Sequence, residues 1–340
     1  MIEPALPMAS RNREVPPDVK RYPLNLSAFA RFTYEIDSGS PLFRLYEKGK
    51  VRQWDARTVV DWSMPLDPTN PLALPLSTFP LARSEWFLRL PAADREAIIC
   101  QYQNWLVSQF LHGEQFGVLS ASRIALEAEN LDVRLFAAQQ AVDEVRHLET
   151  YARLIEKMGE LHAPSVPFAA FLDEVISANS VDLVCLGLQI IGEGIGLASF
   201  AQIREYTGSS LVREVYARIM EDEARHVAFG RQYLAPLYRE LSSAELTERE
   251  QFALAAIELM AERFYALDVW ERFALPGKQA IDLLQKSASF RIYRRHLFKQ
   301  IVPVVKDIGL FTAPMIRLLE GLGVHGYGDI DLVGQGAWKK

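Results

Sequence analysis

A duplicated set of six carboxylate and imidazole side chains in this 340-residue chain could bind metal ions. The set is Glu114, Glu144, His147, Glu193, Glu223 and His226. Each member of the second half follows its counterpart in the first by 79 residues. A single Glu-x-x-His is usually an ordinary surface pair. Two copies at one offset, each preceded by a glutamate thirty residues earlier, indicate a common site.

The spacing fixes where these side chains lie if each half folds as an antiparallel pair of helices. Glu114 and Glu144 are almost equally distant from Asn130, and the second half has the same arrangement around Gly208. Folding each half at that turn brings its two glutamates to one height, about 22 Å from the turn at the helical rise per residue. Glutamate and histidine three positions apart emerge from one helix face. Packing the two pairs together therefore predicts one cluster inside a four-helix core.

The charge of this cluster calls for cations. Unpaired buried carboxylates are costly or take up protons, whereas two divalent ions balance four carboxylates. Oxygen and imidazole ligands without thiolates suit iron or manganese better than structural zinc. One glutamate from each of two helices and Glu-x-x-His from each of the other two is the known ligand scheme of dinuclear carboxylate bundles. We expect two iron ions, with manganese or a mixed Mn/Fe pair as the alternative.

Residues beside the expected ligands have two expected roles. Outside the ligands, Asp143 and Asp222 would hold the far nitrogen of a ligating histidine on the opposite helix pair. Arg146 and Arg225 are expected to support this outer group, with simple ion pairs to the glutamates as the alternative. Small residues would leave room for substrate beside the metals, with two larger ones as walls: Gly117, Ala141, Gly194 and Gly196, and Phe116 and Leu197. The glycines at 192–196 do not form a nucleotide loop, because the GxGxxG pattern fails at Leu197.

The elements that position these residues are long helices. Apolar residues recur at three- and four-residue spacing between the prolines, which predicts helices at 92–128, 132–158, 180–206, 210–241 and 242–273. Shorter helices are expected at 168–177, 285–301 and 314–321. No strand pattern is present, so the fold class is all-α. We expect a proline-rich wrapping segment at 1–91, the metal bundle at 92–241, further helices at 242–322, and a flexible tail at 323–340.

Composition excludes several other classes of protein. The chain is 49% hydrophobic and carries a net charge of -6 without dense basic runs, so nucleic acid is not an expected partner. Two distant cysteines argue against a disulfide scaffold, and no signal peptide is recognisable, which favours the cytoplasm. The most apolar stretch, 181–201, contains Asp182, Gln189 and Glu193, so we interpret it as a buried helix and not a membrane span.

The doubled DExRH motif with its two upstream glutamates resembles the ferritin-like di-iron carboxylate superfamily over residues 92–241. Within it, the hydroxylase subunits of bacterial multicomponent monooxygenases and the small subunits of ribonucleotide reductase are the most similar. The resemblance implies that the six residues bind two metal ions that react with O2 when reduced.

Three positions bear on which activity the resemblance implies. Leu197 replaces the threonine of the monooxygenases, which argues against their hydroxylation machinery. Ile219 replaces the additional histidine ligand of arylamine N-oxygenases, which places that activity lower. Tyr151 occupies the place of the radical tyrosine of ribonucleotide reductase, where it is either redox-active or packs with its hydroxyl hydrogen-bonded.

Three functional hypotheses follow. The first is an O2-activating oxidase or oxygenase, monooxygenase-like, that acts on a small, largely apolar organic substrate and receives electrons from a ferredoxin or reductase. The second is a radical generator that uses Tyr151, and the third is a non-enzymatic, ferritin-like iron-binding protein. Storage subunits are much shorter than this chain, so the third ranks last. A homodimer is the expected assembly.

Overall fold

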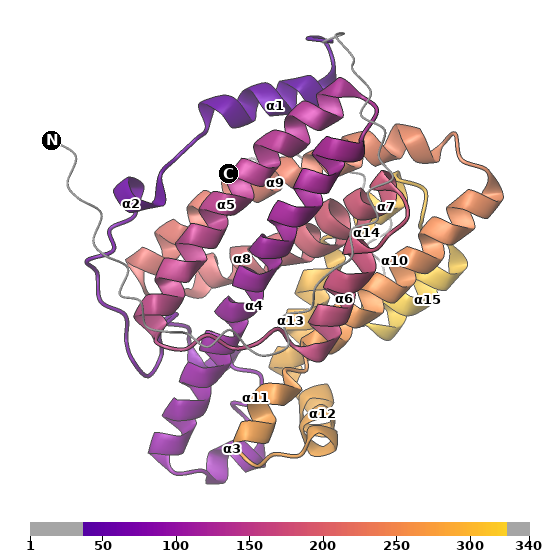
Figure 1. Ribbon diagram of the computed structural model, residues 1–340. Coiled ribbons are helices and arrows are strands. Elements are labelled where there is room, and N and C mark those ends of the chain that lie inside the picture. The colour runs from indigo at the N-terminus through magenta and orange to yellow at the C-terminus, as the bar shows by residue number, and fades with distance from the viewer. Residues whose placement is uncertain (1–36, 325–340) are drawn as a thin grey trace, which may run out of the picture.

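The computed structural model describes residues 37–324, and this range forms helices without a strand, as the sequence predicts (Figure 1). The first helix pair consists of α4 (Ala92–Glu127) and α5 (Leu131–Met158), which pack closely against each other. The second consists of α7 (Val181–Cys185), the π-helical segment η2 (Leu186–Gly192) and α8 (Glu193–Tyr206), followed by α9 (Ser210–Tyr238). These helices bury the core that surrounds the six predicted ligands.

The turns of both helix pairs form where the sequence predicts them. The side chain of Asn130 accepts hydrogen bonds from the backbone N–H groups of Asp132 and Val133, which caps α5. Gly159 ends the same helix in a left-handed conformation, with φ of 105°, which glycine adopts without steric cost. Gly208 lies between α8 and α9, and its N–H donates to the carbonyl oxygen of Ala73.

The expected continuous helix over 180–206 contains one feature that its apolar pattern does not reveal. The backbone widens into the π-helical segment η2 directly before Glu193. Gly187 allows this segment to lie against α6 (Val166–Ile176), because a Cβ atom there would come within 2.4 Å of Val175. π-Helical turns inside α-helices frequently occur at functional sites, and this one ends directly before the predicted ligand Glu193.

The described part of the N-terminal region, residues 37–91, covers one side of the helix pairs. It contains α1 (Pro41–Val51), α2 (Ala56–Val59), the 3₁₀ turn η1 (Leu76–Thr78) and α3 (Glu85–Arg89). Helix α1 packs on α5 and α9, and it lies across one end of the bundle in Figure 1. Residues 1–36 of the expected wrapping segment lie outside the described residues.

The C-terminal region differs from the sequence expectation at one helix. The helix expected over 242–273 is two helices, α10 (Ser243–Arg263) and α11 (Leu267–Arg272). Ser242 and Glu245 form the predicted capping box at its start. The break occurs at a position without glycine or proline. Ala266 adopts a φ of 50° there, and the indole N–H of Trp270 donates to the carbonyl oxygen of Tyr265.

The remaining C-terminal helices are short. They are α12 (Gly277–Lys286), α13 (Ala288–Lys299), α14 (Val302–Asp307) and α15 (Ala313–Gly321). The helix expected at 285–301 is therefore shorter, and α12 and α14 were not expected. Almost all of the expected tail, 325–340, lies outside the described residues.

The apolar helix over Val181–Tyr206 is long enough to span a membrane by length and composition. Its most apolar window is 89% buried inside the protein. Burial of this kind is typical of a core helix, and it agrees with the interpretation of 181–201 as part of the bundle.

Candidate metal centre

The structure brings the six predicted ligand residues together between four helices. Glu114 comes from α4, Glu193 begins α8, and the two Glu-x-x-His pairs come from α5 and α9. None of the six is more than 9% exposed. The antiparallel geometry deduced from the turn positions therefore describes the molecule.

The six side chains form two overlapping groups. The first contains Glu114, Glu144, His147 and Glu223, and the second contains Glu144, Glu193 and His226; within each group the candidate ligand atoms lie within 4.8 Å of one another. Glu144 belongs to both groups, which makes its carboxylate a candidate bridge between two ions.

Each histidine directs its Nδ1 atom at three carboxylates. The His147 Nδ1 atom lies 3.1 Å from Glu223 Oε1 and 3.4 Å from oxygens of Glu114 and Glu144. The His226 Nδ1 atom lies 3.3 Å from Glu144 Oε1, 3.6 Å from Glu223 Oε2 and 3.8 Å from Glu193 Oε1. Glu223 thus also faces both rings. One imidazole nitrogen grouped with three carboxylates is the set of ligands expected around a metal cation.

The electrostatics of the cluster are dominated by burial. Burial raises the pKa of Glu114 and of Glu193 well above the ordinary carboxyl value. Burial acts in the same direction on Glu144, but the nearby charges of His226 and His147 lower its pKa to about 2. Burial would lower the pKa of both histidines, yet the surrounding carboxylates raise it well above the ordinary value. Without ions, the cluster must therefore hold protons.

Several buried atoms of the cluster lack a hydrogen-bond partner, which is a test of whether metal ions fit there. They are the Nδ1 atoms of His147 and His226 and the Oε2 atoms of Glu193 and Glu223. Buried polar atoms are nearly always satisfied, so such a concentration requires an explanation. All four are nitrogen or carboxylate oxygen, the donor types that suit iron and manganese. The residues present fit a pair of such ions.

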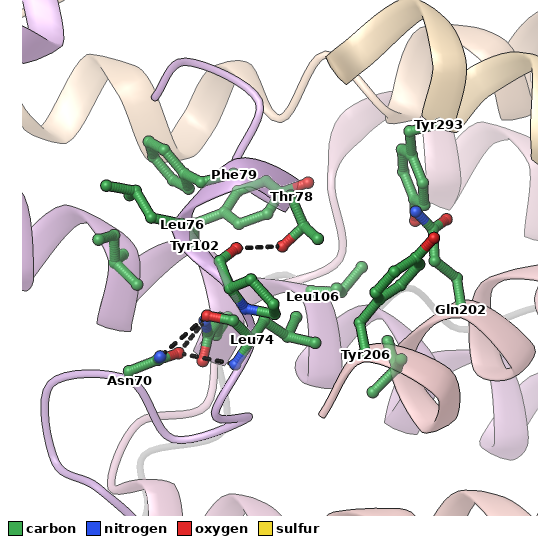
Figure 2. Close-up of a pocket in the computed structure, with 14 residues that line it drawn as sticks. Asn70, Leu74, Leu76, Thr78, Phe79, Tyr102, Leu106, Gln202, Tyr206 and Tyr293 are labelled. Carbon is green, nitrogen blue, oxygen red and sulfur yellow. Dashed lines mark hydrogen bonds between the residues drawn. The ribbon is translucent and has the colours of Figure 1, made fainter. Parts of the chain in front are cut away.

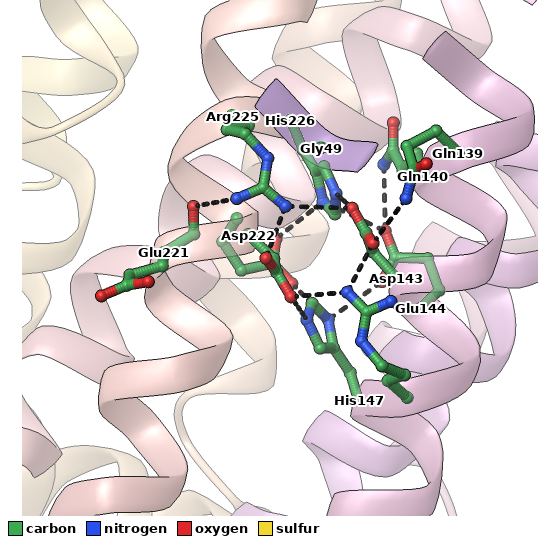
Figure 3. Close-up of polar contacts among 12 residues, drawn as sticks. Gly49, Gln139, Gln140, Asp143, Glu144, His147, Glu221, Asp222, Arg225 and His226 are labelled. Carbon is green, nitrogen blue, oxygen red and sulfur yellow. Dashed lines mark hydrogen bonds and ion pairs between the residues drawn. The ribbon is translucent and has the colours of Figure 1, made fainter. Parts of the chain in front are cut away.

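The four charged residues expected outside the ligands form a crossed network between α5 and α9 (Figure 3). The Nε2 atom of His147 lies 3.1 Å from Asp222 Oδ2, and the Nε2 atom of His226 lies 3.3 Å from Asp143 Oδ2. Arg146 and Arg225 each donate to both aspartates. Each histidine is thus oriented by an aspartate of the other helix pair, with Nδ1 left to face the glutamates.

Several residues of the site carried no sequence signal. Trp54 lies between α1 and α2; its indole N–H donates to Asp222 Oδ2 over 2.8 Å, and its ring stacks on His147. Gln53 from the same loop donates to Asp143. Neither belongs to a repeated motif, so only the packing of the N-terminal region reveals them.

A pair of buried glutamines contacts the ligands from the other side. The amide of Gln140 donates to Glu144 Oε1 over 3.0 Å and to Glu193 Oε1 over 2.6 Å. Gln189, in the π-helical segment, donates to Gln140 Oε1. Gln140 precedes Glu144 by one turn, so its counterpart in the second half is Ile219, which is fully buried. The two halves of the repeat therefore differ one turn before each glutamate.

A cavity opens beside the predicted ligands and is lined by Glu114, Glu144, Glu193 and Glu223. Of the residues expected to shape a substrate pocket, Phe116, Gly117 and Gly196 line it. Ala141, Gly194 and Leu197 do not, which corrects that expectation. Gly194 lies instead against the start of α14, where a Cβ atom would be 3.0 Å from Cγ2 of the N-cap residue Ile301.

Much of the cavity wall comes from residues that the motifs do not mark. Phenylalanines 110, 168, 171 and 200 line it, together with Met260 and Arg263 from α10. A second cavity lies further along α4 and α8 (Figure 2); it is lined by Tyr102, Tyr206 and Tyr293 among others and by none of the six predicted ligands.

Tyr151 is fully buried on α5, one turn beyond His147. Its ring centroid lies 6.0 Å from that of Tyr216 and 5.8 Å from that of Phe110. The Tyr151 and Tyr216 hydroxyls interact with each other, although neither forms a hydrogen bond of ordinary geometry. Burial raises the pKa of the Tyr151 hydroxyl well above its ordinary value.

Comparison with known proteins identifies a protein family and a set of similar solved structures. The model of the family described as P-aminobenzoate N-oxygenase AurF matches residues 39–309. A search of curated protein sequences finds no match. Several similar solved structures are variants of an R2-like ligand-binding oxidase with an aerobically reconstituted Mn/Fe cofactor. One is 19% identical and covers 81% of this chain and 96% of that chain, with a TM-score of 0.54. Another is 18% identical and covers 81% and 95%, also with a TM-score of 0.54. At these identities the likeness concerns the fold.

Proposed function

Since the chain belongs to the P-aminobenzoate N-oxygenase AurF family, we propose that it uses O2 and two metal ions to oxidise a small, largely apolar organic substrate. One observation carries this proposal: two buried histidines each present Nδ1 to three carboxylates beside a cavity with phenylalanine walls. Membership of an N-oxygenase family makes the protein an oxygen-using metal oxidoreductase.

The geometry supports a specific distribution of ligands. Glu114 and His147 would hold one ion, Glu193 and His226 the other, and Glu144 and Glu223 would bridge them. Four carboxylates then balance two divalent ions. Iron is the proposed metal, with manganese or a Mn/Fe pair as the alternative, because the donors suit both and the structurally similar oxidases carry Mn/Fe. When reduced, such ions supply the electrons that activate O2.

The protein's own residues would prepare the site for that chemistry. Asp143 and Asp222 hold the histidines with Nδ1 directed inward, and Gln140 orients Glu193. The phenylalanine walls exclude water from the space beside the ligands, which strengthens electrostatic interactions there. Substrate would bind in this cavity, next to Glu114 and Glu193.

The reaction of the family's named member deserves the first assay. Ile219 argues against arylamine N-oxygenation, whereas the family match favours it. Ile219 still cannot act as a seventh metal ligand, because its side chain is a hydrocarbon. We therefore propose oxidation of a substrate nitrogen as the leading reaction and oxidation at carbon as the alternative.

A second candidate function rests on Tyr151, which is fully buried one turn beyond His147. A radical generator would form a tyrosyl radical there after exposure to O2. The electron paramagnetic resonance signal of that radical, lost in Tyr151→Phe, would support this function. If no such signal appears, the radical generator is rejected and the oxidase remains the proposed function.

Anaerobic loading with ferrous iron, followed by O2, tests the proposed function. We expect two irons per chain, a transient absorbance, and O2 uptake above that of free iron. Glu144→Gln should lose the transient absorbance and the additional O2 uptake, whereas the substitution Glu149→Gln, at an exposed position on the same helix, should retain them. Oxygen uptake no greater than that of free iron would reject the function.

The expected partners follow from this chemistry. Repeated turnover needs an electron donor, for which we propose a ferredoxin or reductase. We further propose a homodimer located in the cytoplasm. Gel filtration of the full chain distinguishes a dimer from the cage of many subunits that a ferritin-like storage protein would form.

A further inference from the structure

Helix α13 and the residues around it carry a concentration of positive charge that the candidate metal centre does not use. The whole chain has a net charge of -6, yet residues 283–306 contain no aspartate or glutamate. The same range contains six lysines and arginines, which are Lys286, Arg291, Arg294, Arg295, Lys299 and Lys306. A strongly basic segment in an acidic chain indicates a surface that attracts an anionic partner.

Three of these side chains lie along one face of α13. Arg291, Arg295 and Lys299 follow one another at four-residue spacing, which places them on the same side of the helix. Ile292 lies next to this row and is 57% exposed. Arginine is enriched in protein–protein interfaces, where exposed apolar side chains become buried. We call these four residues the cationic stripe.

Contacts within the protein orient Arg291 without neutralising it. Its Nη1 atom donates to the carbonyl oxygens of Gln285 and Lys286, at 2.8 and 2.9 Å. Within residues 37–324, neither Arg291 nor Arg295 forms an ion pair with a carboxylate, whereas Lys286 pairs with Asp282. Both arginines of the cationic stripe therefore have a charge available to a partner.

The position of α13 connects the cationic stripe to the candidate metal centre. The helix packs on α8, which begins with the predicted ligand Glu193. Directly after α13, the side chain of Ile301 lies against Gly194, the residue that follows this ligand. Arg295 and Ile292 are about 9 and 14 Å along the helix from that contact, at 1.5 Å per residue. A protein bound to the cationic stripe would thus lie close to the predicted ligands.

We propose that the cationic stripe is the docking surface for an acidic electron-transfer protein. Opposite charges would steer the two proteins together, and Ile292 would be buried between them. The inference rests on the proposed function, because only that chemistry requires an electron donor. Two molecules of a one-electron donor would each lose one electron, and the two oxidised metal ions would each gain one.

An acidic [2Fe–2S] ferredoxin in its oxidised form tests the docking surface by calorimetric titration of the metal-loaded protein. We expect binding that weakens at least about tenfold between about 20 and 200 mM NaCl, because salt screens exposed charges. Cytochrome c, a basic electron-transfer protein, should not bind. The measurement reports affinity and does not depend on turnover.

Substitutions separate this surface from the net charge of the chain. Arg295→Glu should weaken ferredoxin binding at least about tenfold, because like charges would then face each other. Lys48→Glu is the matched control: it changes the net charge equally at an exposed position on α1, which packs on α5 and α9 instead of α8. It should leave the affinity nearly unchanged. Ile292→Ser should weaken binding about tenfold at both salt concentrations, because it removes buried apolar surface.

Three results would overturn the inference. Equal affinities of Arg295→Glu and Lys48→Glu would show that net charge alone attracts the ferredoxin. A change of oligomeric state in Arg295→Glu, with ferredoxin binding unchanged, would make the cationic stripe a subunit interface. Binding of wild-type protein to phosphatidylserine vesicles but not to ferredoxin would make it a lipid-binding surface.

Failure of the docking surface is distinguishable from failure of the proposed function. A protein that does not bind the ferredoxin would still consume O2 when it is loaded with ferrous iron. A protein without the proposed function would lack that iron-dependent O2 uptake whatever its affinity for the ferredoxin.

Discussion

Gly117 offers a substitution that should weaken metal binding and leave the fold intact. A Cβ atom at this position would lie 2.9 Å from Glu144 Cδ, 3.0 Å from its Oε2 and 3.1 Å from its Cγ. Carbon atoms in ordinary contact are separated by about 3.5–4.0 Å, so the Glu144 carboxylate must retreat by roughly 0.5–1 Å in Gly117→Ala. Glu144 is the residue shared by both groups of candidate ligands.

The fold should tolerate this change because the displaced atoms are the end of a flexible side chain. Overpacking costs about 1–3 kcal/mol, and the helix preference of alanine over glycine returns about 1 kcal/mol. We expect net destabilisation of the metal-free protein by about 0–2 kcal/mol in urea unfolding. Metal affinity should fall at least about tenfold, since a displacement of about 0.5 Å is enough to disrupt a site of this kind.

Gly113 is the matched control, one turn earlier on α4. A Cβ atom there would meet only Phe168 Cζ, at the ordinary distance of 3.6 Å. Gly113→Ala should therefore keep both ions and gain up to about 1 kcal/mol of stability. Metal content is measured after dialysis against a chelator of known affinity. If Gly117→Ala binds iron as tightly as Gly113→Ala, the assignment of Glu144 as the bridge is wrong.

Three further predictions concern the cluster and its surroundings. Asp222→Asn should weaken iron binding about 10- to 100-fold in a competitive titration, because it removes the acceptor that orients His147; unchanged affinity would refute that role. Trp54→Phe deletes one donor to Asp222 and should give a smaller loss in the same titration, so a loss exceeding that of Asp222→Asn would contradict this order. The stability of the metal-free protein should depend on pH with a definite sign. Folding raises the pKa of Glu114 above 4.5 and that of His147 above 6.5, so the stability they provide is present below those values and is lost as pH rises through the folded pKa. The unfolding free energy of the metal-free protein should thus decline from about pH 6 to 8, whereas that of the metal-loaded protein should not. Urea unfolding at several pH values measures both, and an equal dependence on pH in the two forms would contradict this prediction.

The central site could be deduced from the sequence because it is encoded by periodic spacing. One offset of 79 residues and two turns determine which faces of four helices meet. The helix ends at Asn130 and Gly159 follow from local capping, which acts within a few residues. Spacing of this kind can be interpreted without knowledge of the tertiary contacts.

The features that were missed depend on contacts between distant segments. Trp54 reaches Asp222 only because α1 packs on α5 and α9. Arg263 reaches the cavity only because α10 ends there, at a break that no glycine or proline announces. The π-helical segment before Glu193 cannot be predicted from an apolar run, because it is a backbone feature that the pattern of side chains does not encode.

Anomalous X-ray diffraction from crystals of the iron-loaded protein tests the central claim most directly. Two peaks should appear between α4, α5, α8 and α9, about 3.5–4 Å apart, with a carboxylate of Glu144 between them. One peak, no peak, or iron bound away from His147 and His226 would contradict the dinuclear centre.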